Sequence, residues 1–138
     1  MTGGTVVAVV EDKASVLEAI GHLLRAYGFH PKTFASAEAF LARDTREEEP
    51  ACLILDISLG GMSGIDLQRH MKAKALGVPV IIITTACDEI TRRRAKDAGC
   101  VAYLRKPFPP EQLICEIERA TSLTTPLLAT RSLDAWHG

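Results

Sequence analysis

Three carboxylates, two hydroxyls and one ammonium group each follow a short apolar segment of this chain, directly or after one residue. They are Glu11, Asp12, Asp56, Thr84, Thr85 and Lys106. Two carboxylates about 5 Å apart repel by roughly 3 kcal/mol at an effective dielectric of 20. Three carboxylates brought together therefore require a bound cation or a protonated member. A few carboxylates that stay open to water and phosphate oxygens suit Mg²⁺ (or Mn²⁺) better than Ca²⁺.

The apolar segments alternate with helical patterns along the chain. Short runs rich in β-branched residues predict strands, and apolar residues spaced three and four apart predict the helices between them. The predicted strands are Thr5–Val10, His30–Phe34, Cys52–Leu55, Val80–Ile83 and Val101–Leu104. The predicted helices are Val16–Tyr27, a segment capped by Ser36 that runs to about Arg43, Ile65–Ala75, Glu89–Ala98 and Pro110–Leu123. Three helices end at a glycine, which is a common helix stop: Gly28, Gly77 and Gly99.

This alternation predicts an α/β fold with a parallel sheet covered on both faces. Pro31 cannot donate to a strand ladder, so the second strand belongs at a sheet edge. Right-handed crossovers then favour a (βα)5 doubly wound, flavodoxin-like sheet with the strand order 2-1-3-4-5. In such sheets the ligand binds beyond the carboxyl ends of the strands, at the switch between strands one and three. The six polar residues are expected at that edge.

Asp56 ends the strand at the switch point, so its carboxylate is the expected nucleophile for a phosphoryl group. The two acidic residues after the first strand would hold the metal. Lys106 would neutralise one phosphoryl oxygen. The Thr84 hydroxyl and the Thr85 backbone N–H would donate to another.

Four segments resemble the receiver domain of bacterial response regulators, the phosphoacceptors of two-component signalling. They are VVED at 9–12, LILDISLGGMSGIDL at 53–67, PVIIITT at 79–85 and YLRKPF at 103–108. The resemblance extends from about Thr5 to Leu123 and is strongest to the nitrogen-fixation-type regulators. It implies that a sensor histidine kinase passes a phosphoryl group from a phospho-His to Asp56 in a Mg²⁺-dependent reaction. It also implies that the chain is no enzyme beyond catalysing its own phosphorylation and dephosphorylation.

The resemblance also assigns roles to individual residues. The metal ligands would be Glu11, Asp12, Asp56 and the backbone carbonyl of Ser58. Lys106 would precede a cis proline, Pro107. Thr84 and Tyr103 would form a switch pair that reshapes the face made by the fourth helix, the fifth strand and the fifth helix.

Two positions depart from the pattern of the family. Gly60 stands where a proline is usual, in a loop, Leu59–Gly64, that contains three glycines and is expected to be more flexible. Thr85 replaces the usual alanine or glycine, and its bulk would narrow access to the phosphoryl group. Neither change removes a catalytic group.

Other functions compete with this interpretation. A haloacid-dehalogenase-type phosphatase needs an aspartate two residues after its nucleophile, where this chain has Ser58. A flavodoxin-like flavin binder needs a phosphate loop after the first strand, where Glu11 and Asp12 would repel the phosphate. A scaffold that works without phosphorylation, and an N-terminal fragment of a DNA-binding transcription regulator, remain alternatives.

The composition limits the partners. With a net charge of −1, the 138 residues predict no direct contact with nucleic acid or with an anionic membrane. The segment Met1–Val10 lacks the features of a secretion signal, and no apolar run reaches the roughly 18 residues of a membrane helix. A cytoplasmic location is expected. Besides the kinase, the expected partners are an output domain, a downstream protein or a second copy of the chain after phosphorylation.

Residues 1–123 are expected to form the receiver domain, and residues 124–138 a flexible tail or linker. Arg92, Arg93 and Arg94 are interpreted as a solvated helix face, with protein docking as the alternative. The four cysteines have no metal-ligand spacing and are expected to be reduced thiols of the core. Among them, Cys87 falls in a loop beside the expected site.

Overall fold

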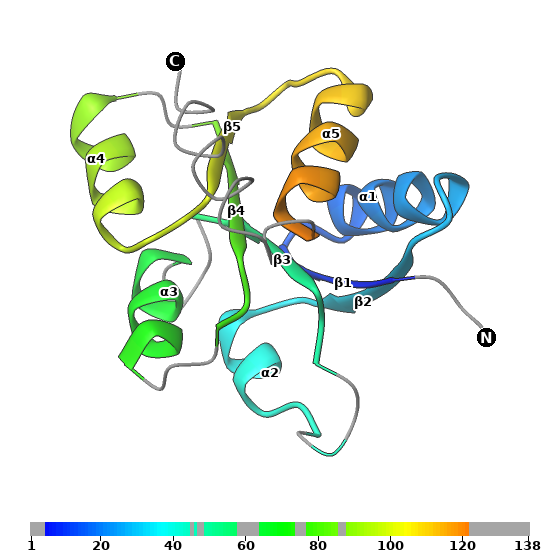
Figure 1. The fold of residues 1–138 in the computed structure, drawn as a ribbon, viewed down its shortest axis with the longest axis horizontal. Coiled ribbons are helices and arrows are strands. Elements are labelled where there is room, and N and C mark those ends of the chain that lie inside the picture. Colours follow the sequence, from blue (N-terminus) through cyan, green and yellow to red (C-terminus); the bar gives the residue numbers. More distant parts are fainter. Residues whose placement is uncertain are drawn as a thin grey trace.

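The computed structural model describes residues 5–44, 46, 49–57, 64–73, 77–85 and 88–121. These residues form strands and helices in strict alternation (Figure 1). The strands are β1 (Val6–Val10), β2 (His30–Phe34), β3 (Cys52–Asp56), β4 (Val80–Thr84) and β5 (Ala102–Arg105). The helices are α1 (Ala14–Ala26), α2 (Ala37–Leu41), α3 (Gly64–Ala73), α4 (Glu89–Asp97) and α5 (Pro110–Thr121). All strands pair in parallel in the order β2-β1-β3-β4-β5, which confirms the predicted topology.

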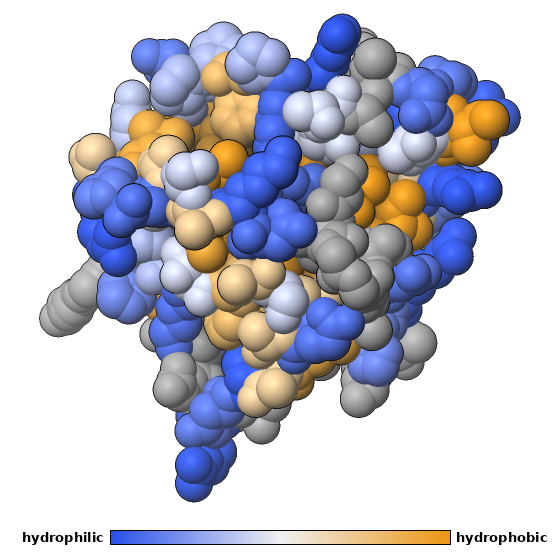
Figure 2. Space-filling model, turned by 180° about the vertical axis from the view of Figure 1, so that it is seen from behind, coloured by the Kyte–Doolittle hydropathy of each residue, from blue (hydrophilic) through white to orange (hydrophobic). Residues whose placement is uncertain are grey.

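The sheet is the middle of three layers, with α1 and α5 on one face and α2, α3 and α4 on the other (Figure 1). Strands β1, β3 and β4 are buried along their whole length because both faces are covered. Alternate residues of each strand therefore enter two separate cores. In Figure 2 the hydrophobic side chains that reach the surface lie in small patches between hydrophilic ones.

Local signals set the helix boundaries. The Ser36 hydroxyl accepts a hydrogen bond of 3.0 Å from the backbone N–H of Ala39 and so caps α2, as predicted. Gly28, Gly77 and Gly99 have φ angles of 87°, 70° and 97°, a conformation that side chains with a Cβ rarely adopt. The predicted helix stops at Gly28 and Gly99 are therefore confirmed, since α1 ends at Ala26 and α4 at Asp97, whereas the residues between α3 and Gly77 lie outside the described part of the chain.

Two helix ends and one cysteine differ from the predictions. Helix α2 ends at Leu41 rather than near Arg43, because the Arg43 guanidinium lies over the Phe40 ring and donates to the Phe40 carbonyl at the helix end. Tyr27, the last residue of its predicted helix, lies outside α1, which ends at Ala26, and is 49% exposed. Cys115 was expected in the core but is exposed.

Some predictions concern residues outside the described part of the chain. These are residues 74–75 of the third predicted helix, residues 122–123 of the last one, most of the loop 59–64, Cys87 and the tail 124–138.

Candidate functional site

The carboxyl ends of β1, β3, β4 and β5 meet at one edge of the sheet and bring the predicted polar residues together. Glu11 follows β1 directly, and Asp56 and Thr84 are the last residues of β3 and β4. The strand register fixes their level, because Asp56 pairs with Ile83 and Thr84 pairs with Arg105. Lys106 follows β5, and its backbone N–H donates to the Thr84 carbonyl at 2.7 Å.

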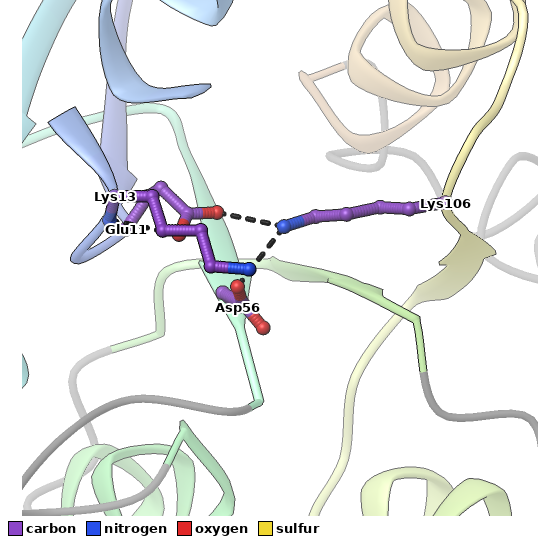
Figure 3. A network of polar contacts seen from close by, with 4 residues as sticks. All are labelled: Glu11, Lys13, Asp56 and Lys106. Carbon is purple, nitrogen blue, oxygen red and sulfur yellow. Dashed lines mark hydrogen bonds and ion pairs between the residues drawn. The ribbon is translucent and has the colours of Figure 1, made fainter. Parts of the chain in front are cut away.

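The Lys106 ammonium bridges two buried carboxylates (Figure 3). Its Nζ lies 2.8 Å from Glu11 Oε1 and 3.0 Å from Asp56 Oδ2. The Glu11 side chain is 0% exposed and that of Asp56 is 6% exposed, whereas Lys106 keeps 16% of its side chain at the surface. The site therefore holds two carboxylates out of water with one cation between them.

Backbone contacts hold Glu11 in this position. Its N–H donates to the carbonyl of Phe34 at 3.1 Å, and its Oε2 accepts a hydrogen bond of 3.2 Å from the Lys13 N–H. Burial raises the pKa of Glu11 above its usual value, against hydrogen bonds from Lys106 and Lys13, and the neighbouring Asp56 carboxylate raises it further. The side chain is thus fixed in place although its charged form is disfavoured.

The pKa of Lys106 is raised as well, but for a lysine this favours the charged form. Burial acts to lower its pKa, but hydrogen bonds to Glu11 and Asp56 and the charges of both carboxylates outweigh burial and raise it. Lys106 therefore stays protonated at neutral pH and compensates much of the repulsion that the sequence predicts for an empty acidic cluster.

The acidic cluster has the donor atoms for a divalent cation. One carboxylate oxygen from each of Glu11, Asp12 and Asp56 lies within 4.8 Å of the others. Asp12 is exposed, so water can complete the coordination that Mg²⁺ prefers. Oxygen donors of this kind fit the predicted metal, and three of the four predicted ligands are together. The fourth, the Ser58 carbonyl, lies outside the described residues.

The two threonines differ in burial, and the two proposed switch residues lie on the same face of the sheet. Thr84 is fully buried, whereas Thr85 is exposed. Tyr103 pairs with Ile82, two residues before Thr84, and its half-buried ring packs against the core on the α2–α4 face. Strand alternation puts Thr84 on that same face. The Lys106–Pro107 peptide bond is cis, as predicted from the resemblance.

A glycine that the sequence analysis counted only as part of a flexible loop proves to be a packing requirement. A Cβ on Gly64 would lie 2.5 Å from the Asp56 carbonyl oxygen and 2.8 Å from Ile57 Cα. The Gly64 N–H also donates to the Ile57 carbonyl at 3.1 Å. The start of α3 therefore lies directly against the backbone that carries Asp56, and only glycine fits there.

An open apolar pocket of about 580 Å³ adjoins the site on the α1 side. Its walls include Val16, Ala19 and Ile20 of α1 and Phe108 after β5, and Lys106 lies at its margin. A molecule seated in this pocket would lie beside the ammonium that contacts Asp56.

The remaining sequence candidates lie away from this cluster. Arg92, Arg93 and Arg94 are on α4. Arg93 and Arg94 are exposed as interpreted, whereas Arg92 is half-buried with its Nε atom inside the protein, so the solvated face comprises only two of the three. Cys52 and Cys100 are buried free thiols, and burial raises the pKa of each to about 12. Buried thiols with such pKa values are poor nucleophiles at neutral pH.

A parallel five-stranded sheet of this order, with an acidic group and a lysine at its carboxyl edge, defines the receiver class. The sequence matches the response regulator receiver domain over residues 7–118, so the chain belongs to this family. This confirms the recognised resemblance and is incompatible with the phosphatase and flavin-binder alternatives. No helix among the described residues is long and apolar enough to cross a membrane.

The chain is similar to several known proteins. It is 36% identical over 119 residues to the response regulator protein TodT of Pseudomonas putida, covering 86% of this chain and 52% of TodT. It is 32% identical to the DNA-binding response regulator MtrA of Mycobacterium leprae, covering 80% of this chain and 48% of MtrA. The crystal structure of FixJ-N has 31% identity and a TM-score of 0.80, covering 90% of this chain and 98% of FixJ-N. The chain spans about half the length of the curated relatives it matches.

Proposed function

We propose that this chain is a phosphoacceptor receiver in a two-component phosphorelay. In this proposal Asp56 takes a phosphoryl group from the phospho-His of a sensor histidine kinase, with a divalent cation bound. The observation that supports it best is the Lys106 bridge between the buried carboxylates of Glu11 and Asp56. Asp56 lies at the switch point of the sheet, and its partner Lys106 still reaches solvent. Lys106 can therefore leave the Asp56 carboxylate and pair with an incoming phosphoryl group.

The proposed reaction is a displacement at phosphorus. A carboxylate oxygen of Asp56 forms a bond to phosphorus, and the bond from phosphorus to the imidazole nitrogen of the donor breaks. The electron pair of the broken bond stays on that nitrogen, which takes up a proton when it leaves as histidine. Lys106 then turns from the Asp56 carboxylate to a phosphoryl oxygen, and the Thr84 hydroxyl and the Thr85 N–H donate to another.

The acidic cluster would hold the cation. Mg²⁺ or Mn²⁺, when bound, neutralises charge on the carboxylate and phosphoryl oxygens during transfer. Glu11, Asp12 and Asp56 are the proposed side-chain ligands, because their oxygens are already within 4.8 Å of one another. The Ser58 carbonyl is kept as the fourth proposed ligand.

The donor domain of the kinase would dock on the apolar pocket beside Lys106. The pocket lies between α1 and the segment after β5, next to the edge where the phosphoryl group must arrive. Its Val16, Ile20 and Phe108 walls suit an apolar helix face rather than a charged one.

Phosphorylation would change the α4–β5–α5 face through Thr84 and Tyr103. Thr84 ends β4 at the site, and Tyr103 lies on the neighbouring strand on the same side of the sheet. An inward shift of Thr84 would free space for the Tyr103 ring, a two-state population shift. Thr84→Ala should then suppress the NMR shift changes of Tyr103 on phosphorylation, and unchanged shifts would contradict the coupling.

The wider role follows from the relatives. Because the chain spans about half of TodT and MtrA, we propose that an output domain or a separate downstream protein reads the switched face, or that two phosphorylated copies pair through it. A DNA-binding output, as in the name of MtrA, is one such case. We also propose a cytoplasmic location, which the free thiols of the three described cysteines favour, and no enzymatic activity beyond the chain's own phosphorylation and dephosphorylation.

Acetyl phosphate, which needs no kinase, tests the proposal. With Mg²⁺, intact-protein mass spectrometry should show one added phosphoryl group on wild type, and none on Asp56→Asn or after chelation of the metal. Asp66→Asn, an exposed carboxylate change on α3, is the matched control and should label like wild type. Equal labelling of Asp56→Asn would refute the assignment, and no labelling of wild type would leave the phosphorylation-independent scaffold as the function.

A further inference from the structure

A second cavity lies at the opposite end of the sheet from Asp56. It has a volume of about 270 Å³ and lies between α3, the start of β4 and the turn that joins α4 to β5. Its apolar walls come from Met71, Val78, Val80 and Ala98. An apolar cavity of about 150 Å³ is enough to bind benzene, so this one has room for a small ring with substituents.

One polar side chain that lines this cavity, Gln68, lacks a strong hydrogen-bond partner. Gln68 is 2% exposed, and apart from the Cys100 thiol neither its amide nitrogen nor its amide oxygen has a hydrogen-bond partner in the described part of the chain. Burial raises the pKa of the Cys100 thiol to about 12, and a hydrogen bond from the Gln68 side chain acts to lower it. A thiol is only a weak hydrogen-bond partner, so this contact satisfies little of the amide. A buried donor and acceptor left unsatisfied are destabilising, and folded proteins rarely retain them without a partner. A ligand in the cavity would supply that partner.

The chemistry of the lining defines the ligand. Gln68 offers one N–H donor and one carbonyl acceptor on the same planar group, which is complementary to a neighbouring N–H and C=O on a ligand. The described residues that line the cavity carry no charged side chain, so an ionic ligand would lose its hydration without compensation. The walls otherwise accept an apolar body.

Two exposed glycines form part of the cavity wall. Gly77 and Gly99 both line it, and a Cβ on either would meet no atom within 4 Å. Both have a positive φ, so a side chain at these positions would also strain the backbone. The backbone at the mouth of the cavity is therefore accessible to a ligand of several atoms.

We propose that this cavity binds a small, neutral, planar molecule that carries a lactam- or urea-like edge, with Gln68 as the residue that recognises that edge. The ligand would connect α3 to the end of α4, and its binding does not require phosphorylation of Asp56. Asp56→Asn should therefore bind it like wild type, so this proposal and the proposed function can fail independently.

The test uses 2-pyridone, a planar ring with adjacent N–H and C=O groups, titrated into the full chain and followed by NMR. Saturable shifts are expected at the backbone amides of Gly77, Val78 and Gly99 and at the Gln68 side-chain amide. Nuclear Overhauser contacts from the ring to the Met71 methyl and to the Gln68 amide protons should appear in wild type. Gln68→Met should weaken binding at least tenfold, whereas Gln112→Met, the same change on the exposed face of α5, should leave it unchanged.

Four results would overturn the proposal. The first is the absence of those Overhauser contacts in wild type, which decides the matter even if Gln68→Met fails to fold. The second is equal affinity of wild type and Gln68→Met. The third is binding of benzene as tight as that of 2-pyridone, which would indicate an apolar cavity without recognition by Gln68. Benzoate, a planar anion, should bind more weakly than 2-pyridone if neutrality matters, and tighter binding would also contradict the proposal.

Discussion

The two ends of the sheet bury polar groups in different ways. At the carboxyl end, Glu11 and Asp56 share one ammonium, Lys106, within 3.0 Å of each carboxylate. At the amino end, the Gln68 amide is equally buried and, among the described residues, has no hydrogen-bond partner except the weak one offered by the Cys100 thiol. Both ends lie on the same framework of parallel strands, so the fold does not explain the difference.

The difference indicates how each end can be used. A polar group that already has a partner is part of the folded structure, and removing the partner is costly. A buried polar group without a hydrogen-bond partner destabilises the folded state unless a ligand supplies the partner. Substitutions at the two ends should therefore change stability in opposite directions.

Lys106→Met should produce the largest change in stability. Without the ammonium, two buried carboxylates face each other, and we expect the metal-free protein to lose about 2–4 kcal/mol. Mg²⁺ should restore part of that loss, since it replaces the missing positive charge. Urea unfolding with and without Mg²⁺ measures both effects, and Arg105→Met, an exposed cation one residue earlier, should change stability by less than about 0.5 kcal/mol. Similar small losses in both variants would show that Lys106 does not hold the cluster.

Gly64→Ala tests whether α3 must lie against the backbone of Asp56. The new Cβ would meet backbone atoms that cannot move aside, so we expect a loss of about 1–3 kcal/mol and slower phosphoryl uptake. Gly21→Ala is the control, because its Cβ would make only ordinary contacts at 3.8 Å or more inside α1. It should stabilise the protein by about 0.5–1 kcal/mol. Equal effects of the two variants in urea unfolding would contradict the close approach.

Gln68→Met should increase stability, in contrast to Lys106→Met at the carboxyl end of the sheet. Replacing an unsatisfied amide by an apolar side chain of similar length should stabilise the ligand-free protein by about 1 kcal/mol. Gln112→Met on the exposed side of α5 should be close to neutral. Thermal unfolding of the two variants side by side provides the measurement, and a loss of stability specific to Gln68→Met would mean that the amide has a partner in solution.

Glu11→Gln gives the smallest expected effect, a change in pH dependence. Because burial raises the folded pKa of Glu11 above 4.5, the folded state holds its proton more tightly than the unfolded state does. The stability of wild type relative to Glu11→Gln should therefore fall as the pH rises from 4.5 through the folded pKa. Denaturant unfolding at several pH values without metal tests this, and a relative stability that rises over that range would reverse the assigned direction.

Much of the fold could be predicted because its signals are local. Pro31 indicated the edge strand, Gly28 and Gly99 ended helices, and the buried β-branched runs became the central strands. The strand ends then placed Asp56 and Lys106 at one edge without knowledge of any side-chain contact.

Long-range contacts could not be predicted in the same way. The pairing of Lys106 with Glu11 joins residues 95 positions apart, and its geometry depends on the register of β4 with β5. Gln68 was overlooked because polar residues on helices usually face solvent. Its spacing of three residues from both Ile65 and Met71 puts it on the apolar stripe of α3, and that spacing could have identified it.

The central claim is that Asp56 accepts the phosphoryl group, and chemical trapping of the acyl phosphate tests it most directly. After incubation with acetyl phosphate and Mg²⁺, borohydride reduction should convert the phosphorylated aspartate to homoserine, which replaces one oxygen of the carboxyl group by two hydrogens. Peptide mass spectrometry should then locate homoserine at position 56, and unmodified aspartate at Asp12 and Asp66. Homoserine at either of those positions, with intact aspartate at position 56, would contradict the account.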